Sequence, residues 1–183
     1  NDCDGQTDED SSVDASTWYQ DNDSDGYGHP NITDVACYQP NNYVDNSDDC
    51  RPNDSSAYPG APEYCDGHDD DCDGQTDEAS ALDAQVWYSD TDGDGYGNTN
   101  STLIQCYQPN NYVGIGGDCR PNDNTAHPNA TEYCDGHDDD CDGQTDEDSA
   151  ADAATWYHDG DSDGYGDPND SEVDCYQPNN HVS

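Results

Sequence analysis

The stretch CDGHDDDCDGQTDE, from Cys65 to Glu78, recurs without change from Cys134 to Glu147 and in part from Asp2 to Glu9. The repeated letters keep a spacing of 69 residues, with no insertion or deletion between the copies. Self-similarity at a fixed period indicates supersecondary modules that meet their neighbours in an array. We therefore expect three modules, at residues 1–69 (truncated at its start), 70–138 and 139–183 (truncated at its end).

The composition is extreme for a folded chain. Among 183 residues, 45 are acidic and 2 are basic, the formal net charge is −43, and Phe and Met are absent. Such a chain buries too little apolar surface to offset the entropy lost on folding. Ten cysteines at repeated positions point to an oxidising compartment, where disulfides replace a large core.

The same composition limits the location and the partners. The sequence contains no apolar run of the roughly 20 residues that a membrane helix needs. A surface this acidic repels nucleic acid. We expect a piece of a longer extracellular or cell-surface protein, with no membrane insertion in this segment and no nucleic-acid partner.

One type of acidic loop reads DNDSDGYG from Asp21, and two further copies keep its Asp and Gly residues while the residues between them vary. Carboxylates on alternate residues of a tight loop, with Gly at the sixth position, wrap a hard cation such as Ca²⁺. The twelfth position, Glu in an EF-hand, is not Glu here, so further ligands must come from another segment or from water. The predicted ligands are Asp21, Asp23, Asp25, Asp90, Asp92, Asp94, Asp159, Asp161 and Asp163.

The opening stretch contains a second type of loop, which reads DxDxDGxxD. This pattern is similar to the loops of thrombospondin type 3 repeats, which implies that calcium replaces a hydrophobic core. With one Ca²⁺ in each complete loop, about ten negative charges would be neutralised, and the chain becomes foldable. The predicted ligands are Asp69, Asp71, Asp73, Asp77, Asp138, Asp140, Asp142 and Asp146, with Asp2, Asp4 and Asp8 in a truncated copy.

The segments between the acidic loops predict a loop-rich fold with short β-strands and little helix. The runs TWYQD and CYQPNNYV suit short strands followed by turns, and the tryptophans are expected to anchor a tiny core. The variable stretch 79–85 is expected to be a linker or a short, weak helix. The predicted fold class is a tandem, extended array of small modules stabilised by disulfides and calcium.

Two other features recur at fixed module positions. The sequons NIT, NST and NDS predict glycosylation of Asn31, Asn100 and Asn169 in surface loops. Arg51 and Arg120 are the two basic side chains, and both follow the dipeptide DC. We expect them to act as internal counterions for nearby carboxylates.

Read in order, the motifs WYxDxDxDGYG, CYQPNNYV, DCRPND, PGAPEYC and CDGHDDDCDGQTDE closely resemble the MopE-type metal-binding repeat of bacterial and archaeal surface and secreted proteins. The resemblance covers essentially the whole chain. It implies an extracellular tandem array that binds metal, described in some members for copper. Where the family usually carries Asp or Asn after DC, this sequence has Arg51 and Arg120, so we do not expect a third metal site at Asp49, Asn53 and Asp54.

The residue types favour Ca²⁺ over copper. Copper prefers imidazole, thiolate or thioether ligands, but the sequence lacks Met and its cysteines are expected to be oxidised. His68 and His137 occupy one module position, and each lies alone among carboxylates. The other histidines have no counterpart in the other modules: His29, His127, His158 and His181.

The cysteine spacing leaves two periodic disulfide schemes open. The preferred scheme keeps the loops short and local to the metal motifs, and it leaves Cys3 and Cys175 without partners. It pairs Cys37 with Cys50, Cys65 with Cys72, Cys106 with Cys119, and Cys134 with Cys141. The other scheme pairs Cys3 with Cys37 and Cys50 with Cys65, and continues in that order to Cys141 with Cys175.

Together these patterns predict a calcium-binding extracellular structural protein that forms a stalk, sheath or filament, rigidified by Ca²⁺, disulfides and glycans. Its partners would be neighbouring modules or copies of itself, with glycans as a further candidate. The alternative is an adhesin segment or a metal-scavenging module that binds copper or calcium at a surface. No enzyme is predicted, because carboxylate pairs are uninformative in so acidic a chain and nothing catalytic stands outside the repeat.

Overall fold

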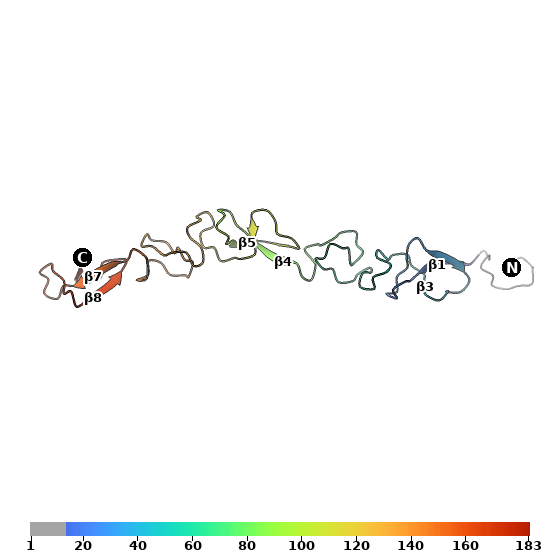
Figure 1. The fold of residues 1–183 in the computed structure, drawn as a ribbon, viewed down its shortest axis with the longest axis horizontal. Coiled ribbons are helices and arrows are strands. Elements are labelled where there is room, and N and C mark those ends of the chain that lie inside the picture. Colours follow the sequence, from blue (N-terminus) through green and yellow to red (C-terminus); the bar gives the residue numbers. More distant parts are fainter. Residues whose placement is uncertain (1–13) are drawn as a thin grey trace, which may run out of the picture. The chain divides into compact units, whose positions relative to one another are not determined.

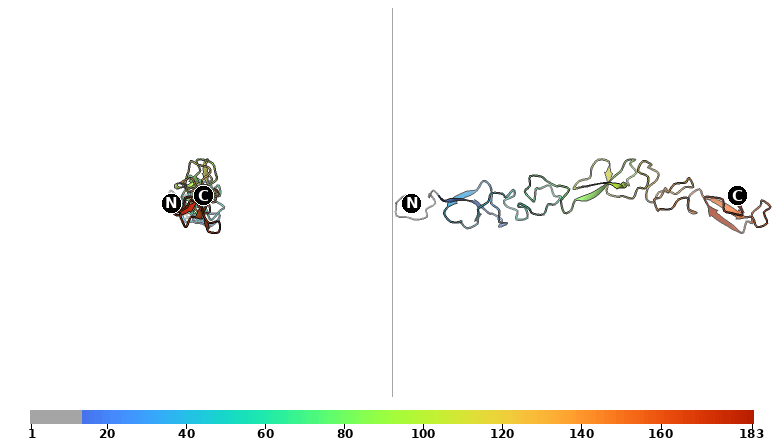
Figure 2. Two further views of the ribbon diagram at one scale, coloured as in Figure 1. Left: turned by 90° about the vertical axis from the view of Figure 1, so that its left-hand side faces the viewer. Right: turned by 180° about the vertical axis from the view of Figure 1, so that it is seen from behind.

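The computed structural model describes residues 14–183. Within this range short strands lie among long irregular segments and no helix is present (Figure 1). Turns and irregular backbone also dominate the two further views (Figure 2). The strands are β1 (Ser16–Gln20), β2 (Thr33–Ala36), β3 (Tyr43–Val44), β4 (Gln85–Ser89), β5 (Asn98–Gln105), β6 (Tyr112–Val113), β7 (Ala154–His158), β8 (Ser171–Asp174) and β9 (His181–Val182).

The strands form three small sheets, and the aromatic run supplies the central strand of each: the orders are β2-β1-β3, β5-β4-β6 and β8-β7-β9. In the first sheet β1 is antiparallel to both neighbours, with Trp18 opposite Asp34. The indole Nε1 of Trp18 donates a hydrogen bond to the carbonyl of Ala36 (3.0 Å). The loop-rich fold and the short strands at the aromatic runs are therefore confirmed.

The structure corrects one local expectation and decides between the alternatives of another. The sequon at Asn100 lies within β5 rather than in a loop, because the run from Thr99 to Ile104 is rich in β-branched residues that favour strands. Residues 79–84 form successive turns, with the amides of Ala81 and Ala84 bonded to carbonyls three residues earlier, so of the two alternatives expected for this stretch the linker is present and the weak helix is not.

The interior contains small apolar side chains and carboxylates in place of a hydrophobic core. The largest side chain that is almost completely buried is Asp49, which is 2% exposed. Buried acids must be hydrogen-bonded or paired with cations, because an isolated buried charge is costly. The buried residues are Ala36, Ala57, Ala61, Ala81, Ala126 and Ala150, with Asp49, Glu63, Asp70, Asp118, Glu132 and Asp139, and the glycines Gly28 and Gly97.

The structure contradicts both disulfide schemes. Among the described residues the disulfides are Cys50–Cys72, Cys65–Cys106, Cys119–Cys141 and Cys134–Cys175. The preferred scheme was wrong because it ranked cysteines by closeness in sequence, whereas these bonds join segments that are 22 or 41 residues apart and meet in space. Their Cα–Cα distances of 5.5 and 5.2 Å lie in the normal range for a disulfide. Cys3 lies outside the described residues.

The chain divides into two compact units. The first comprises Asn1–Gln85 and Gln105–Tyr107, and the second comprises Val86–Ile104 and Gln108–Ser183. Both disulfides of each repeat lie within one unit. None of the described residues belongs to a helix long and apolar enough to cross a membrane. The boundaries of the three modules, which follow from the 69-residue period, remain a prediction.

Candidate metal sites

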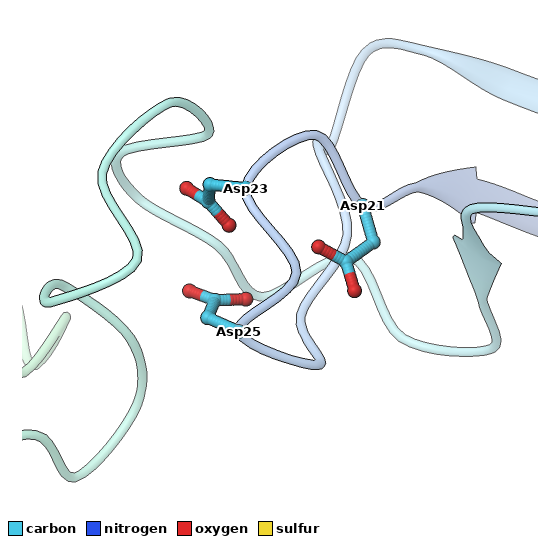
Figure 3. A group of neighbouring side chains, drawn as sticks. All are labelled: Asp21, Asp23 and Asp25. Atoms are coloured by element: carbon cyan, nitrogen blue, oxygen red, sulfur yellow. The ribbon is translucent and has the colours of Figure 1, made fainter.

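The loop that follows β1 brings three aspartates together. The carboxylate of Asp21 accepts hydrogen bonds from the amides of Ser24 (2.7 Å) and Gly26 (3.2 Å), which close the loop. Gly26 has φ +94°, a conformation that side chains disfavour. One oxygen from each of Asp21, Asp23 and Asp25 lies within 4.8 Å of the others, and the three carboxylates turn toward one another (Figure 3). The predicted grouping of these aspartates is present, and Asp90, Asp92 and Asp94 form the same cluster.

A fourth carboxylate, which sequence reasoning did not assign to this loop, comes from the DCRPND segment. The amide of Asp49 donates to the carbonyl of Gly28, just after the loop (3.4 Å), and Asp49 Oδ1 accepts from the amide of Arg51 (2.7 Å). A Cβ at Gly28 would clash with the side chain of Tyr19 and with the carbonyl oxygen of Asn46, so glycine is needed where this segment passes close to β1 and to the residues after β3. In the second unit the amide of Asp118 donates to the carbonyl of Gly97 in the same way (3.3 Å).

These acids leave buried oxygens without hydrogen-bond partners among the described residues. In the first loop they are both oxygens of Asp23, Oδ2 of Asp25 and Oδ2 of Asp49; the second loop repeats them at Asp92, Asp94 and Asp118. Desolvation is the main cause that raises the pKa of Asp49, and the charges of Asp25 and Asp23 raise it further. Buried acceptors that lack donors and repel one another are the arrangement that a bound cation would stabilise.

The third loop of this type has the same backbone but a different environment. The carboxylate of Asp159 accepts from the amides of Asp163 (3.2 Å) and Gly164 (3.0 Å). Asp161 and Asp163 are exposed, whereas their equivalents in the other two loops are half-buried.

The second loop type is folded around a buried glutamate. Glu63, which is 5% exposed, accepts hydrogen bonds from the amides of Asp70 (2.8 Å), Asp71 (3.2 Å) and Asp77 (3.2 Å). Oxygens of Glu63, Asp69 and Asp71 lie within 4.8 Å of one another, and Glu132, Asp138 and Asp140 repeat the cluster. Glu63 therefore fixes the loop backbone and faces the predicted ligands.

One predicted ligand of this loop, Asp77, is engaged in hydrogen bonds. Asp77 Oδ1 accepts from the amide of Gly67 (2.9 Å) and Oδ2 accepts from the hydroxyl of Tyr107 (3.0 Å), so both of its carboxylate oxygens are engaged in hydrogen bonds. The neighbouring Glu78 instead has both carboxylate oxygens buried without a partner among the described residues. The spacing of the loop residues favoured Asp77 as a ligand. The motif QTDE also contains the adjacent Glu78, and this was the sequence signal for a second candidate.

The second unit repeats this arrangement. Oxygens of Asp140, Asp142 and Glu147 lie within 4.8 Å of one another, while the predicted ligand Asp146 accepts from the hydroxyl of Tyr176. A backbone hydrogen bond lowers the pKa of Glu147, but desolvation and the charges of nearby acids outweigh it, so the pKa is raised.

The two arginines are internal counterions, as predicted. Arg51 contacts Asp70 Oδ1 through Nη1 and Asp54 Oδ2 through Nη2, both at 3.1 Å. Asp54 is thereby engaged with arginine while Asp49 lies beside the Asp21 loop. Arg120 makes the equivalent contacts with Asp123 and Asp139.

The histidines differ in their surroundings. His68 Nδ1 contacts Asp66 Oδ1 (3.0 Å) on the surface, and His137 repeats this contact. In the third sheet His158 lies directly opposite His181, with ring centroids 5.2 Å apart. His181 Nε2 is also 3.4 Å from Glu172 Oε1.

Two sets of predicted sites are not tested by these contacts. Asp2, Asp4 and Asp8 lie outside the described residues. Asn31, Asn100 and Asn169 are all exposed, as glycosylation requires, but their modification remains a prediction.

Comparison with known proteins shows that three segments of the chain match one family model. Residues 1–9, 49–78 and 118–147 match a family model named for copper-binding MopE and described as a "putative metal-binding motif". The second and third segments contain the DC segment and the whole second loop, with the disulfides Cys50–Cys72 and Cys119–Cys141. No curated protein and no solved structure matches the chain. The matched family is a metal-binding motif and not an enzyme family.

Proposed function

Because the chain carries the MopE-type metal-binding motif in repeated segments, we propose that it is a Ca²⁺-binding structural repeat protein of the cell exterior. The observation that carries the proposal is the set of buried, partnerless carboxylate oxygens on the Asp21 loop and on Asp49, whose amide is hydrogen-bonded to Gly28 just after that loop. A divalent cation between them would supply the missing partner and remove their mutual repulsion.

The donor atoms decide the class of metal. Every candidate ligand in these clusters is a carboxylate oxygen, and hard cations prefer oxygen. Ca²⁺ accepts six to eight oxygens in flexible geometry, whereas Mg²⁺ demands a near-ideal octahedron and keeps several waters. Four carboxylates on a loop and a covering segment suit Ca²⁺ better than Mg²⁺.

Two sites per complete repeat follow from this assignment. The first would use Asp21, Asp23, Asp25 and Asp49, or Asp90, Asp92, Asp94 and Asp118. The second would use Asp69, Asp71, Asp73 and Glu78, or Asp138, Asp140, Asp142 and Glu147. Glu63 and Glu132 would hold the loop backbone of the second site in place. The Asp159 loop holds three further candidate ligands.

The role of the metal would be to hold each repeat together. The first site ties the loop after the central strand to a segment beyond the third strand of the same sheet, with no apolar core between them. The disulfides suit an oxidising exterior, where calcium sites of extracellular modules have dissociation constants of about 10⁻⁴ to 10⁻³ M. Neighbouring modules or copies of the chain, with glycans at the exposed sequons, would build a stalk, sheath or filament.

Isothermal titration calorimetry and near-ultraviolet circular dichroism test this proposal. We expect Ca²⁺ to bind in at least four sites, Mg²⁺ to bind more weakly, and the aromatic dichroism to collapse in excess EDTA. Heat of binding no larger than that of a matched acidic peptide mixture, with an unchanged spectrum in EDTA, would refute it. Light scattering with and without Ca²⁺ tests assembly; a monomer under both conditions would refute self-association.

One observation favours the alternative, a metal-scavenging module. His158, His181 and Glu172 place two imidazoles and a carboxylate together in the third sheet, and imidazole suits copper. The equivalent positions of His158 in the other modules are Gln20 and Ser89. Cu²⁺ binding that is tighter than Ca²⁺ binding and is lost in His158→Gln would support it; Cu²⁺ affinity unchanged by this substitution would exclude the pair.

A further inference from the structure

The disulfide Cys50–Cys72 connects the two proposed metal sites of one repeat. Cys50 directly follows Asp49, the covering carboxylate of the first site, and Cys72 lies between Asp71 and Asp73 of the second site. The Sγ atom of Cys50 is 3.3 Å from the carbonyl oxygen of Asp69, which begins the second loop. Each sulfur is thus one residue away from a proposed ligand.

The position of Cys72 within its loop makes the connection tight. It is the fourth loop residue, and its φ of +58° places it in the left-handed region, as at Ser24 in the first loop (φ +70°). That conformation is uncommon for residues other than glycine. The amide of Cys50 donates to Cys72 Sγ (3.3 Å), so backbone and disulfide both join the loop to the DC segment.

The second unit repeats this arrangement in full. Cys119 follows Asp118, and Cys141 lies between Asp140 and Asp142 with φ +57°. The amide of Cys119 donates to Cys141 Sγ (3.1 Å), and Cys119 Sγ is 3.2 Å from the carbonyl oxygen of Asp138.

The other disulfide of the repeat is placed differently and provides an internal control. Cys65 and Cys106 are followed by Asp66 and Tyr107, neither of which is a proposed ligand. Cys106 Sγ lies 3.7 Å from the carbonyl of Glu78, so this bond touches the second site at one edge and does not connect it to the first.

We propose that Cys50–Cys72 and Cys119–Cys141 are positioning disulfides that couple the paired metal sites to each other and to the redox state of the chain. This inference rests on the proposed function, because it concerns the same Ca²⁺ sites. With the disulfide intact, a cation at one site holds the DC segment and thereby orders the ligands of the other. Reduction frees Asp49 from Asp71 and Asp73, so both sites weaken.

Linkage makes this coupling reciprocal. If the disulfide raises the affinity for Ca²⁺ by some factor, Ca²⁺ stabilises the disulfide against reduction by the same factor. Couplings between sites are typically about 5- to 150-fold in affinity. The coupling should be largest for the disulfide that joins two sites and smaller for Cys65–Cys106.

The redox step uses a dithiol such as dithiothreitol. Its thiolate attacks one protein sulfur, the S–S bond breaks, and a mixed disulfide forms; its second thiol then displaces the other cysteine. The protein gains two electrons and two protons as two thiols, and the reagent becomes a cyclic disulfide. Timed alkylation and peptide mapping then report each protein disulfide separately.

The first experiment measures these reduction equilibria in the unaltered chain with Ca²⁺, Mg²⁺ or EDTA. We expect Ca²⁺ to favour the oxidised forms of Cys50–Cys72 and Cys119–Cys141 by about tenfold or more, within the range of coupled sites. Cys65–Cys106 and Cys134–Cys175 should change several-fold less. Equal protection of all four bonds, or no protection, would overturn the proposal.

The second experiment compares the double variants Cys50→Ser/Cys72→Ser and Cys65→Ser/Cys106→Ser by calorimetry. The first should weaken two Ca²⁺ sites by about tenfold and abolish their cooperativity, while the second should leave the Asp21 site unchanged. Equal effects of the two variants would overturn the proposal. If the first variant does not fold, the reduction equilibria of the unaltered chain decide. Failure of the unaltered chain to bind Ca²⁺ would instead refute the proposed function.

Discussion

The loops that begin at Asp90 and at Asp159 share one sequence pattern and belong to the same compact unit, yet their aspartates are buried to different degrees. Asp92 and Asp94 are half-buried and keep partnerless oxygens, whereas Asp161 and Asp163 are exposed. The DC segment that brings in Asp118 is hydrogen-bonded to Gly97, just after the first loop, whereas none of the described residues makes the equivalent contact with the second loop. The alternating aspartates therefore shape the loop, and a carboxylate from elsewhere in the chain completes and covers the site.

This difference shows that residues within the loop and residues from a distant segment make different contributions to the site. Hydrogen bonds from amides within the loop position Asp90 and Asp159 alike. Burial of the remaining oxygens requires Asp118, whose own pKa is raised mainly by desolvation and further by the charges of Asp92, Asp94 and Asp90. The covered loop should consequently depend on a cation more strongly than the uncovered loop does.

Chelation should produce the largest effect and should sharpen this contrast. Each site held at 100 times its dissociation constant contributes about 2.7 kcal/mol, so four sites would supply an amount comparable to a typical stability of about 5–15 kcal/mol. In EDTA we expect proteolysis within residues 90–96 to accelerate by orders of magnitude. Cleavage within residues 159–165 should change far less. Equal sensitivity of the two loops to EDTA would contradict the claim that the Asp90 loop depends more strongly on a cation.

Removal of the covering charge is the next largest change. Asp118→Asn should weaken Ca²⁺ binding at the Asp90 loop at least tenfold, about 1.4 kcal/mol, because a charged ligand becomes neutral. Terbium luminescence sensitised by Tyr96 would report that loop. The matched control is Asp123→Asn, which removes an acid paired with Arg120 but no proposed ligand. Equal losses in the two variants would show that net charge, and not the site, governs binding.

The second loop type allows a finer distinction between neighbouring acids. Glu147→Gln should lower Ca²⁺ affinity about tenfold or more, whereas Asp146→Asn should mainly weaken the contacts with Gly136 and Tyr176. Titration calorimetry separates the two, since the aspartate variant should lose thermal stability in EDTA while retaining its affinity. A larger loss of Ca²⁺ affinity in Asp146→Asn than in Glu147→Gln would show that Asp146, as the loop spacing predicted, is the ligand.

The smallest effect concerns pH in the metal-free chain. Burial raises the folded-state pKa of Asp49, Asp70 and Asp118 above the value of about 3.8 in the unfolded chain. The folded state then binds more protons than the unfolded state just above that value, so stability falls as pH rises through the raised pKa. In EDTA the melting temperature should therefore rise as pH is lowered through the raised pKa values toward about 3.8. Asp54 and Asp123, whose pKa is lowered by hydrogen bonds from Ser56 and Thr125, oppose this trend only weakly because solvent screens them.

Periodic local patterns made much of the architecture predictable. The alternating aspartates with Gly26 determine a loop through amide bonds only a few residues apart, and the aromatic run gives the central strand. The counterion role of Arg51 followed from its being one of two cations among many acids.

The distant contacts were not predictable from spacing. Asp49 joins the first loop through a backbone bond to Gly28, a contact that depends on how the chain returns after the third strand. The disulfides join Cys50 to Cys72 across 22 residues for the same reason. Glu78 was passed over because Asp77 fits the loop spacing, yet the orientation of Asp77 is set by Tyr107, thirty residues further along.

The most direct test of the account is an anomalous difference map from crystals grown with Tb³⁺, a hard ion that replaces Ca²⁺. We expect peaks bonded to the carboxylates of Asp90, Asp92, Asp94 and Asp118 together, with the equivalent set at Asp21, and weaker occupancy at the Asp159 loop. Tb³⁺ peaks that are not coordinated by Asp49 and Asp118, or equal Tb³⁺ occupancy at all three loops, would contradict the claim that a distant carboxylate completes each site.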